Sequence, residues 1–126
     1  DLERCGLEFQ SQARIYTGSC ALGPCLVTLD EIGDPRGLQI RCSIIRDGQT
    51  LFSEATNTAR LRQPVTETIA WLCRDNPVPA GTVLVTGTGI PVPDSAALAV
   101  GDRVEIEIQG IGRLGNPVGR GATASR

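Results

Sequence analysis

The chain has 126 residues, of which 40% are hydrophobic and 21% are charged, and its formal net charge is −2 at pH 7. These values are ordinary for one compact folded domain, and they exclude a chain drawn by its charge to nucleic acid or to an anionic membrane. Two Phe, one Trp and one Tyr are too few for a base-stacking platform. No apolar run approaches the roughly 20 residues of a membrane span.

The residue types that are missing restrict the chemistry. The chain lacks His, Met and Lys, so all 12 basic residues are Arg. The commonest general base and metal ligand is therefore absent, and so are a Schiff-base lysine and a P-loop lysine. Any chemistry must use Asp, Glu, Arg, Cys, Ser, Thr, Tyr or backbone groups. Because the chain opens on Asp1 without an initiator Met, we expect it to be a piece of a longer protein or a trimmed form.

The cysteines favour a structural role over a chemical one. Their number is odd, and no two of them have the C-x-x-C spacing of a zinc or redox site. A cysteine nucleophile usually needs a basic partner, and the chain has no His to serve as one. We therefore expect buried, reduced cysteines in a cytoplasmic protein, and we disfavour a disulfide-bonded secreted domain. The five are Cys5, Cys20, Cys25, Cys42 and Cys73.

The first part of the chain predicts two short strands separated by turns. Residues 1–12 are polar without a clear period, and residues 13–17 (ARIYT) can form a short strand. Turn residues fill 18–24. The apolar, β-rich run at 25–29 (CLVTL) predicts a second strand, and 30–37 (DEIGDPRG) predicts a loop.

A hairpin and a helix follow. Apolar and polar residues alternate over 38–46, which predicts a half-buried strand. Asp47-Gly48 is a tight-turn pair, and 49–55 is expected to return as the partner strand. A helix is predicted over 64–75, because Pro64 suits a first helical position and apolar residues recur at helical spacing. These are Val65, Ile69, Leu72 and Cys73, and Asn76-Pro77 then ends the helix.

The last part predicts two more strands. Residues 78–87 (VPAGTVLVTG) are expected to turn into a buried strand. Residues 103–109 (RVEIEIQ) alternate strictly, with Val104, Ile106 and Ile108 facing inward. Residues 119–126 are expected to be a flexible tail after a single domain over 1–118. The predicted fold class is mainly β (α+β) with one short helix, without βαβ alternation or an internal repeat.

The stretch VLVTGTGIPVP, residues 83–93, is the clearest candidate site. Gly87-x-Gly89 follows a predicted strand, but a third glycine is absent and Pro91 follows in place of a helix, which disfavours dinucleotide binding. A purely structural turn is one interpretation, since glycine readily adopts positive φ. The other is a substrate clamp in which Thr86 and Thr88 offer hydroxyls and the glycines let the backbone approach a small acid.

Residues 79–118 resemble the C-terminal signature of the fumarylacetoacetate hydrolase superfamily. The matching features are Thr86-Gly87-Thr88, the turn at Gly101-Asp102, the alternating acidic strand, and the run GIGRLGNPV at 110–118. Residues 12–24 (QARIYTGSCALGP) are similar to the family's Ala-Lys-x-aromatic block that ends in Gly-Pro, and Asp1-Leu2-Glu3 is similar to the end of its Arg-Asp-Ile block. The TGTGI and SCALGP versions resemble the branch that dehydrates 2-keto-3-deoxy sugar acids. The resemblance covers nearly the whole chain but only the C-terminal part of the family domain.

This resemblance implies a mixed β roll or sandwich, a homodimer, and a small-molecule oxo acid as substrate. It also implies Mg²⁺ or another divalent metal held by a Glu-x-Glu pair and an Asp. Those ligands lie upstream of the block that Asp1 resembles, so we expect this chain alone to bind no metal tightly. Glu105-x-Glu107 matches the Glu-x-Glu motif in residue type but not in position. It lies on the alternating strand beside Arg103, where a solvated strand face is the simpler interpretation.

The resemblance also assigns candidate site residues. Thr88, Gly87 and Gly89 are implied in substrate binding, and Arg14, a catalytic and substrate-binding candidate, stands where the family has a Lys next to the metal and substrate, which either moves a proton or acts only as an electrostatic clamp. Arg14 can hold a carboxylate by two parallel hydrogen bonds, but it cannot exchange a proton as a lysine of low pKa can. The alternative interpretation of Arg14 is a surface arginine on a short strand without a role in the site. Glu3 is a weaker catalytic candidate for a polar contact or proton shuttle.

Three functions remain open at this point. The first is the C-terminal part of a metal-dependent enzyme, a lyase that dehydrates a 2-keto-3-deoxy sugar acid. The second is a hydrolase or decarboxylase of related oxo acids. The third is a non-catalytic remnant that kept the β core and lost the metal half, which the missing ligands and the Lys-to-Arg change both favour.

Overall fold

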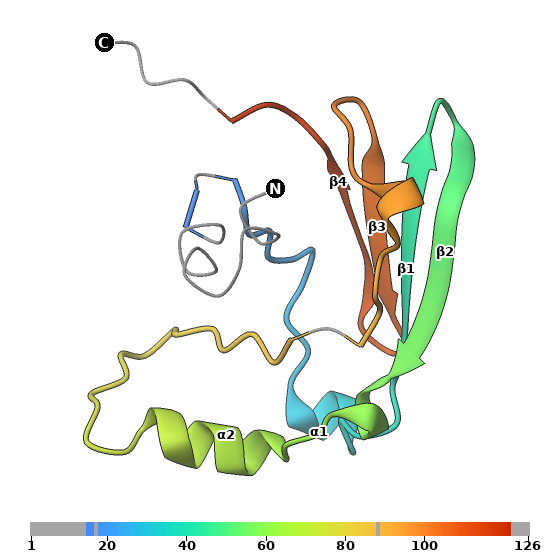
Figure 1. Ribbon diagram of the computed structural model, residues 1–126. Coiled ribbons are helices and arrows are strands. Elements are labelled where there is room, and N and C mark those ends of the chain that lie inside the picture. Colours follow the sequence, from blue (N-terminus) through green and yellow to red (C-terminus); the bar gives the residue numbers. More distant parts are fainter. Residues whose placement is uncertain (1–14, 17, 88, 122–126) are drawn as a thin grey trace, which may run out of the picture.

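The computed structural model describes residues 15, 16, 18–87 and 89–121. Strands hold more of these residues than helices do, and the elements follow one another from Leu29 to Pro117 (Figure 1). The two α-helices are α1 (Leu29–Ile32) and α2 (Val65–Leu72), and two 3-10 turns lie at Thr58–Arg60 and Asp94–Ala96. The four strands are β1 (Gln39–Arg46), β2 (Gln49–Asn57), β3 (Arg103–Ile108) and β4 (Gly112–Pro117).

The strands form one antiparallel sheet in the order β2-β1-β3-β4. The predicted hairpin of β1 and β2 is confirmed. Its turn residues Asp47 and Gly48 both have positive φ, 51° and 75°, which is the backbone that matches the twist of a two-residue hairpin. The strand predicted at 103–109 is also confirmed, as β3, and it pairs with β1 far away in the sequence.

The register gives the sheet one apolar and one polar face. Ile44 of β1 is paired with Phe52 of β2 and with Val104 of β3, so these apolar side chains share a face. The next residues along each strand lie on the other face, where Arg41 is opposite Glu107. The alternation that predicts the strands therefore also predicts which side of the sheet is covered.

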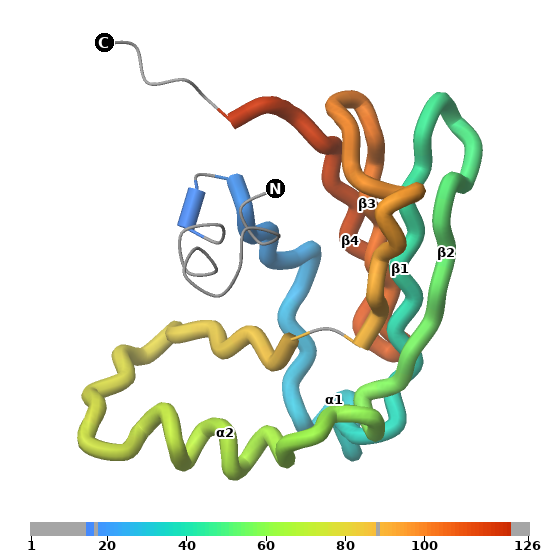
Figure 2. The backbone as a smooth tube through the Cα atoms, in the orientation of Figure 1, coloured from blue at the N-terminus to red at the C-terminus, as the bar shows by residue number. Residues whose placement is uncertain are grey.

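The core lies where residues 90–96 run along the apolar face of the sheet (Figure 2). Among the described residues the buried hydrophobic side chains are Ile44, Ile90 and Ala96, which are 1%, 7% and 3% exposed. Two of them come from the segment that follows the Gly87-x-Gly89 loop. The core thus anchors one side of this loop on the sheet.

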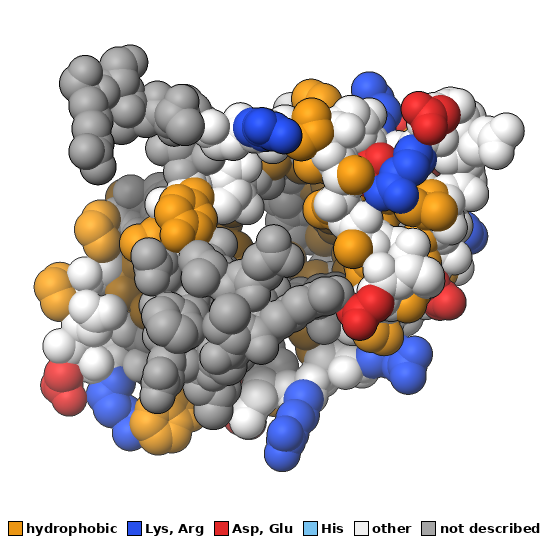
Figure 3. All heavy atoms as spheres, turned by 45° about the horizontal axis from the view of Figure 1, so that its top comes forward, with side chains coloured by type: hydrophobic (Ala, Val, Ile, Leu, Met, Phe, Trp, Pro, Cys, Tyr) orange, Lys and Arg blue, Asp and Glu red, His pale blue; other side chains and the backbone are white. Residues whose placement is uncertain are grey.

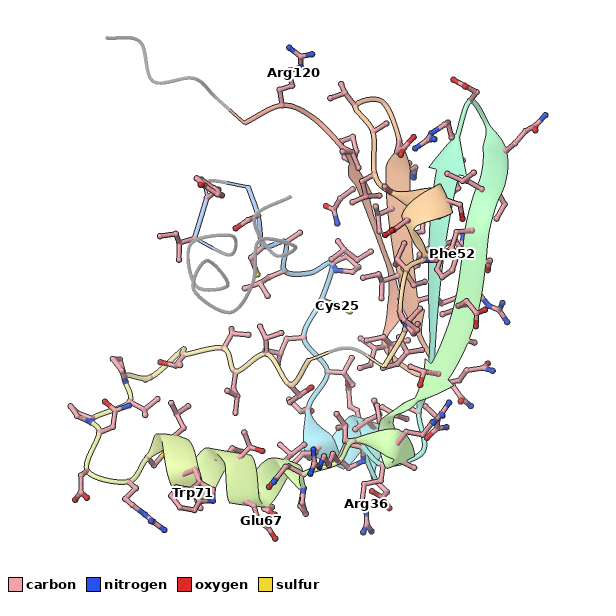
Figure 4. All side chains as sticks on the ribbon, in the orientation of Figure 1. Cys25, Arg36, Phe52, Glu67, Trp71 and Arg120 are labelled. Atoms are coloured by element: carbon pink, nitrogen blue, oxygen red, sulfur yellow. The ribbon has the colours of Figure 1, made fainter. Side chains whose placement is uncertain are left out.

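Helix α2 and the segment after it form an arm, residues 61–86, that leads away from the sheet and returns to it (Figures 1 and 2). The helix is shorter than predicted: it ends at Leu72, and the Asn76 side chain caps it by donating a hydrogen bond to the Leu72 carbonyl at 3.1 Å. None of its residues is buried. Glu67 and Trp71 point away from the returning segment (Figure 4).

Several sequence expectations are wrong. No strand forms at 25–29; Leu29 instead begins α1, a second helix, whose first turn carries Asp30 and Glu31 where acidic side chains favour a helix start. No strand forms at 82–87 either; no described strand pairs with this segment, and Val83 and Val85 are 56% and 70% exposed. The strand β4 was not predicted. The expected mixed β roll is confirmed only as a mostly stranded fold with an antiparallel sheet.

The prediction of buried cysteines is also wrong for the described residues. Cys20, Cys25 and Cys73 are exposed, and Cys42 is half-buried among the strands; all four are free thiols. Partial burial raises the pKa of the Cys42 thiol. The expected strand at 13–17 falls mostly outside the described residues, and Ile15 and Tyr16 are not in a strand.

Candidate functional site

The Gly87-x-Gly89 loop lies at a pocket of about 500 Å³ on the apolar face of the sheet. The pocket has an apolar floor and polar residues around it. The floor is Ile40, Ile106 and Ile108. The remaining lining residues are Thr56, Asn57, Thr58, Arg60, Leu61, Arg62, Thr86, Gly87 and Gly89. A pocket of this size and character suits a small organic acid.

Four segments from different parts of the described chain build this pocket. The end of β2 and the following 3-10 turn supply one wall, β1 and β3 supply the floor, and the end of the arm supplies the loop. Asn57 stabilises the turn, because its side chain accepts a hydrogen bond from the Ala59 backbone N–H at 2.8 Å and donates one to the Gly37 carbonyl at 2.7 Å. This turn places Arg60 beside the pocket.

The charged members of the pocket lining are both cations, Arg60 and Arg62. Neither makes an ion pair with another residue in the part of the chain that the structure describes. An arginine beside an apolar surface can hold a carboxylate by two parallel hydrogen bonds. The described lining has no carboxylate or thiol that could move a proton, so it is suited to binding and orienting an anion. Sequence inspection missed both arginines, because arginines shortly after a strand carry no local signal of a binding site.

The segment from the loop to β3 is held by a buried ion pair. Asp102 is 1% exposed and accepts hydrogen bonds from Nε and Nη2 of Arg46, both at 2.8 Å, and from the Ala99 backbone N–H at 2.8 Å. The same guanidinium donates to the Ala97 carbonyl at 2.9 Å. The Arg46 hydrogen bonds and the Ala99 N–H lower the pKa of Asp102 to about 2. The carboxylate therefore stays ionised and ties residues 97–102 to the end of β1.

Glu105 and Glu107 lie on the polar face, opposite the pocket. Glu105 pairs with Arg103 at 2.8 Å and with Arg113 at 3.4 Å, and Glu107 pairs with Arg113 at 3.2 Å. Figure 3 shows acidic and basic side chains neighbouring one another on the sheet side of the molecule. The expectation that the Glu-x-Glu pair lies on a polar strand face beside Arg103 is confirmed, although Glu107 is exposed and Glu105 is only 19% exposed. Within the described ranges, no group of three His, Cys, Asp or Glu side chains is placed to hold a metal ion.

The predicted site residues fall into two groups. Gly87 and Gly89 both line the pocket. Arg14, Glu3 and Thr88 lie outside the described residues. No helix in the described part of the chain is long and apolar enough to cross a bilayer.

The antiparallel sheet, the Gly87-x-Gly89 loop and the Gly101-Asp102 turn define a β-rich domain, and comparison with known families identifies its kind. The C-terminal family of fumarylacetoacetate (FAA) hydrolases matches residues 4–119. The chain belongs to this family.

The similar proteins include sugar acid dehydratases and an oxaloacetate tautomerase. The chain is 44% identical over 94% of its length to 2-dehydro-3-deoxy-D-arabinonate dehydratase of Saccharolobus solfataricus, and 38% identical over 85% to a probable 2-keto-3-deoxyxylonate dehydratase of Haloferax volcanii. A solved structure of 2-keto-3-deoxy-D-arabinonate dehydratase with magnesium and 2,5-dioxopentanoate superposes with a TM-score of 0.91 at 44% identity. That match covers 94% of this chain and 42% of the other. A mitochondrial oxaloacetate tautomerase of Xenopus laevis is 36% identical over 79% of the chain.

These relatives are longer than the chain. The chain spans 40% of the Saccharolobus dehydratase and 37% of the Haloferax protein. The match therefore concerns one part of each relative, which is the part that contains the Gly87-x-Gly89 loop and the sheet beneath it.

Proposed function

We propose that this chain is the substrate-clamping part of a metal-dependent enzyme that dehydrates a 2-keto-3-deoxy sugar acid. The observation that carries the proposal is the pocket in which the Gly87-x-Gly89 loop meets an apolar floor and two arginines that have no ion-pair partner among the described residues. The similarity to two dehydratases of such acids supports the choice of substrate class. On this proposal the natural protein also contains the carboxylate ligands that the described residues lack.

Each candidate residue has a separate task in the proposal. The loop glycines let the backbone approach the acid, and the Thr88 hydroxyl binds a substrate oxygen. Arg14 pairs with the carboxylate, and Glu3 makes a polar contact or passes a proton. Arg60 and Arg62 make the pocket attractive to an anion and orient it by hydrogen bonds.

The metal is not supplied by the described residues. A relative was solved with magnesium, and in such sites a divalent cation polarises an oxo oxygen and stabilises an enolate. Mg²⁺ prefers oxygen ligands, carboxylates among them, and no group of three or more His, Cys, Asp or Glu side chains comes together in the described ranges. We therefore expect the isolated 126-residue chain to bind Mg²⁺ no more tightly than about 1 mM. Calorimetric titration measures this, and micromolar binding would contradict it.

Two alternatives remain to be separated by experiment. A hydrolase or decarboxylase of related oxo acids would use the same pocket and differ in the bond that breaks. A non-catalytic remnant is favoured by one observation, the lack of a metal-binding cluster in the described residues. A homodimer is part of the proposal in each case, because residues of the arm leave apolar surface exposed.

The test is activity of the natural protein that contains this chain, assayed with Mg²⁺ on 2-keto-3-deoxy pentonates and on oxaloacetate. The expected result is water loss from the sugar acid and none of the competing cleavages, with product identified by chromatography and mass spectrometry. Thr88→Val, which keeps the side-chain volume, should lower kcat/KM by about 5- to 150-fold, because a buried polar group left unpaired costs about 1–3 kcal/mol. Thr50→Val on β2 is the matched control. Full activity of Thr88→Val with a lowered melting temperature would remove Thr88 from the site, and an inactive natural protein would favour the remnant.

A further inference from the structure

Gly87 and Gly89 of the loop are constrained in different ways. Gly87 has a φ of 91°, a backbone conformation that side-chain-bearing residues avoid, and a Cβ added there would meet nothing within 4 Å. Gly89 does not have a positive φ, so its backbone would accept any residue. The constraint on a side chain at Gly89 is a neighbour: a Cβ there would lie 3.1 Å from Oγ1 of Thr56, so that Thr56 would have to move by a few tenths of an ångström.

Thr56 lies near the end of β2 on the apolar face. It is paired with Ile40 of β1, which in turn is paired with Ile108 of β3, and all three residues line the pocket. The Thr56 hydroxyl is buried and has no hydrogen-bond partner among the described residues. A buried hydroxyl without a partner is uncommon because its desolvation is not offset, so its presence under the loop needs an explanation.

We propose that Thr56 is a positioning residue for the ligand: its side chain is the seat on which Gly89 rests, and the contact sets the height of the Gly87-x-Gly89 loop over the pocket floor. This inference rests on the proposed function for the identity of the ligand, a 2-keto-3-deoxy sugar acid. It assigns the role of Thr56 to the shape of its side chain, which fills the space beside Gly89. Gly87 provides the bend of the loop, and Gly89 provides the close approach.

The contact predicts a specific pattern of rescue. Removing Oγ1 and Cγ2 of Thr56 leaves its Cβ as the nearest atom, 3.8 Å from a Cβ at position 89, which is ordinary van der Waals contact. Thr56→Ala should therefore rescue Gly89→Ala. Thr56→Val should not, because a methyl group replaces the hydroxyl at the same place. Gly87→Ala should be rescued by neither variant, since its cost lies in its own backbone.

The experiment uses the natural protein that contains this chain. Gly89→Ala should raise KM for a 2-keto-3-deoxy pentonate about tenfold, which corresponds to about 1.4 kcal/mol, with kcat changed less than about twofold. Gly89→Ala with Thr56→Ala should return KM to within about threefold of the unaltered protein, and Gly89→Ala with Thr56→Val should not. Thr50→Ala on the same strand is the control that should rescue nothing. A Gly89→Ala protein with an unaltered KM, or one whose defect persists with Thr56→Ala, overturns the proposal.

A second readout separates failure of this inference from failure of the proposed function. Hydrogen exchange of the backbone amides at 86–90 is measured by mass spectrometry without substrate. The proteins compared are the unaltered protein, Gly89→Ala, and Gly89→Ala combined with Thr56→Ala or with Thr56→Val. Gly89→Ala should speed exchange in this loop, Thr56→Ala should restore it, and Thr56→Val should not. This pattern supports the seat even if the protein dehydrates no sugar acid. Unchanged exchange in Gly89→Ala overturns the seat even if the protein is an active dehydratase.

Discussion

The sheet with its covering segment and the arm of residues 61–86 are held in different ways. In the sheet, strands distant in sequence are paired, Ile44 is 1% exposed, and Asp102 is 1% exposed and fully hydrogen-bonded. In the arm, α2 has no buried residue, and Ile69 and Trp71 are 46% and 63% exposed. The pocket lies where the two regions meet. The pocket floor therefore belongs to the tightly packed sheet, whereas the arm beside it is weakly held. The arm is the part expected to adapt to a ligand.

The largest expected effect comes from a core truncation on the sheet. Ile44→Ala should lower the free energy of unfolding by about 2–5 kcal/mol, because it removes fully buried methyl groups and leaves a cavity. Its matched variant on the arm, Ile69→Ala, should lower it by less than about 1 kcal/mol. Urea denaturation followed by circular dichroism measures both. Equal losses would show that the arm is packed as tightly as the sheet.

The second effect is a pH dependence that should be specific to the sheet. The pKa of Asp102 is lowered to about 2 in the folded chain by Arg46 and the Ala99 N–H. A carboxyl whose folded pKa lies below its unfolded value stabilises the fold above the unfolded pKa, near 4, and this stabilisation is lost as pH falls towards 2. The melting temperature of the unaltered chain should therefore fall between pH 4 and pH 2 by more than that of Asp102→Asn.

Asp34→Asn is the control for this measurement. Hydrogen bonds from Arg36 also lower the pKa of Asp34. The Asp34 side chain is 56% exposed and the Arg36 side chain is 83% exposed, so solvent screens the pair. The melting profile of Asp34→Asn should follow that of the unaltered chain over the whole pH range. Asp102→Asn with the same acid sensitivity as the unaltered chain would show that Asp102 does not hold the 97–102 segment.

A smaller effect concerns self-association through the arm. Apolar side chains of the arm are exposed, which favours burial against a second copy. We expect the chain to sediment as a dimer at micromolar concentration. Ile69→Ser should weaken the dimer while leaving the free energy of unfolding of the monomer nearly unchanged, and Thr50→Ser on the sheet edge should alter neither. A clean monomer at these concentrations would count against the prediction.

The smallest effect is expected on the polar face of the sheet. Arg113 reaches Glu105 and Glu107 at 3.4 and 3.2 Å but is 58% exposed. Arg113→Ala should change the free energy of unfolding by less than about 0.5 kcal/mol, since exposed ion pairs contribute little and salt screens them. Denaturation at low and high salt measures this. A loss above about 1 kcal/mol would indicate that the ion pairs act as one network that supports the sheet.

The sequence predicts the strands whose side chains alternate and fails for those that lack a partner. Residues 38–46 and 103–109 alternate between an apolar and a polar face, and both form strands as expected. Residues 82–87 are just as β-rich, but they run beside no strand edge, so Val83 and Val85 stay exposed. Strand β4 contains Gly112, Gly115 and Pro117, which disfavour a strand locally, and it forms because β3 offers it a hydrogen-bonding edge.

The candidate site divides in the same way. The glycine loop is recognisable from residues 83–93, because glycine beside a β-rich run is a local pattern. Thr56, Arg60 and Arg62 carry no such pattern, since a threonine at the end of a strand and arginines after it are common on any surface. They become part of a site only because β2 ends beside the loop.

By itself, the sequence determined the hairpin at Asp47-Gly48, the inward face of β3, the position of α2 and the family to which the chain belongs. These depend on neighbours in the chain, on periods of two or 3.6 residues, or on motifs of a few adjacent residues. Only the tertiary structure decided that β1 lies between β2 and β3, that Asp102 meets Arg46, and that Thr56 occupies the space that a side chain at Gly89 would enter. Except in the β1–β2 hairpin, these residues are about 30 or more positions apart in the sequence. A local pattern holds no information on which distant side chain will lie next to a glycine.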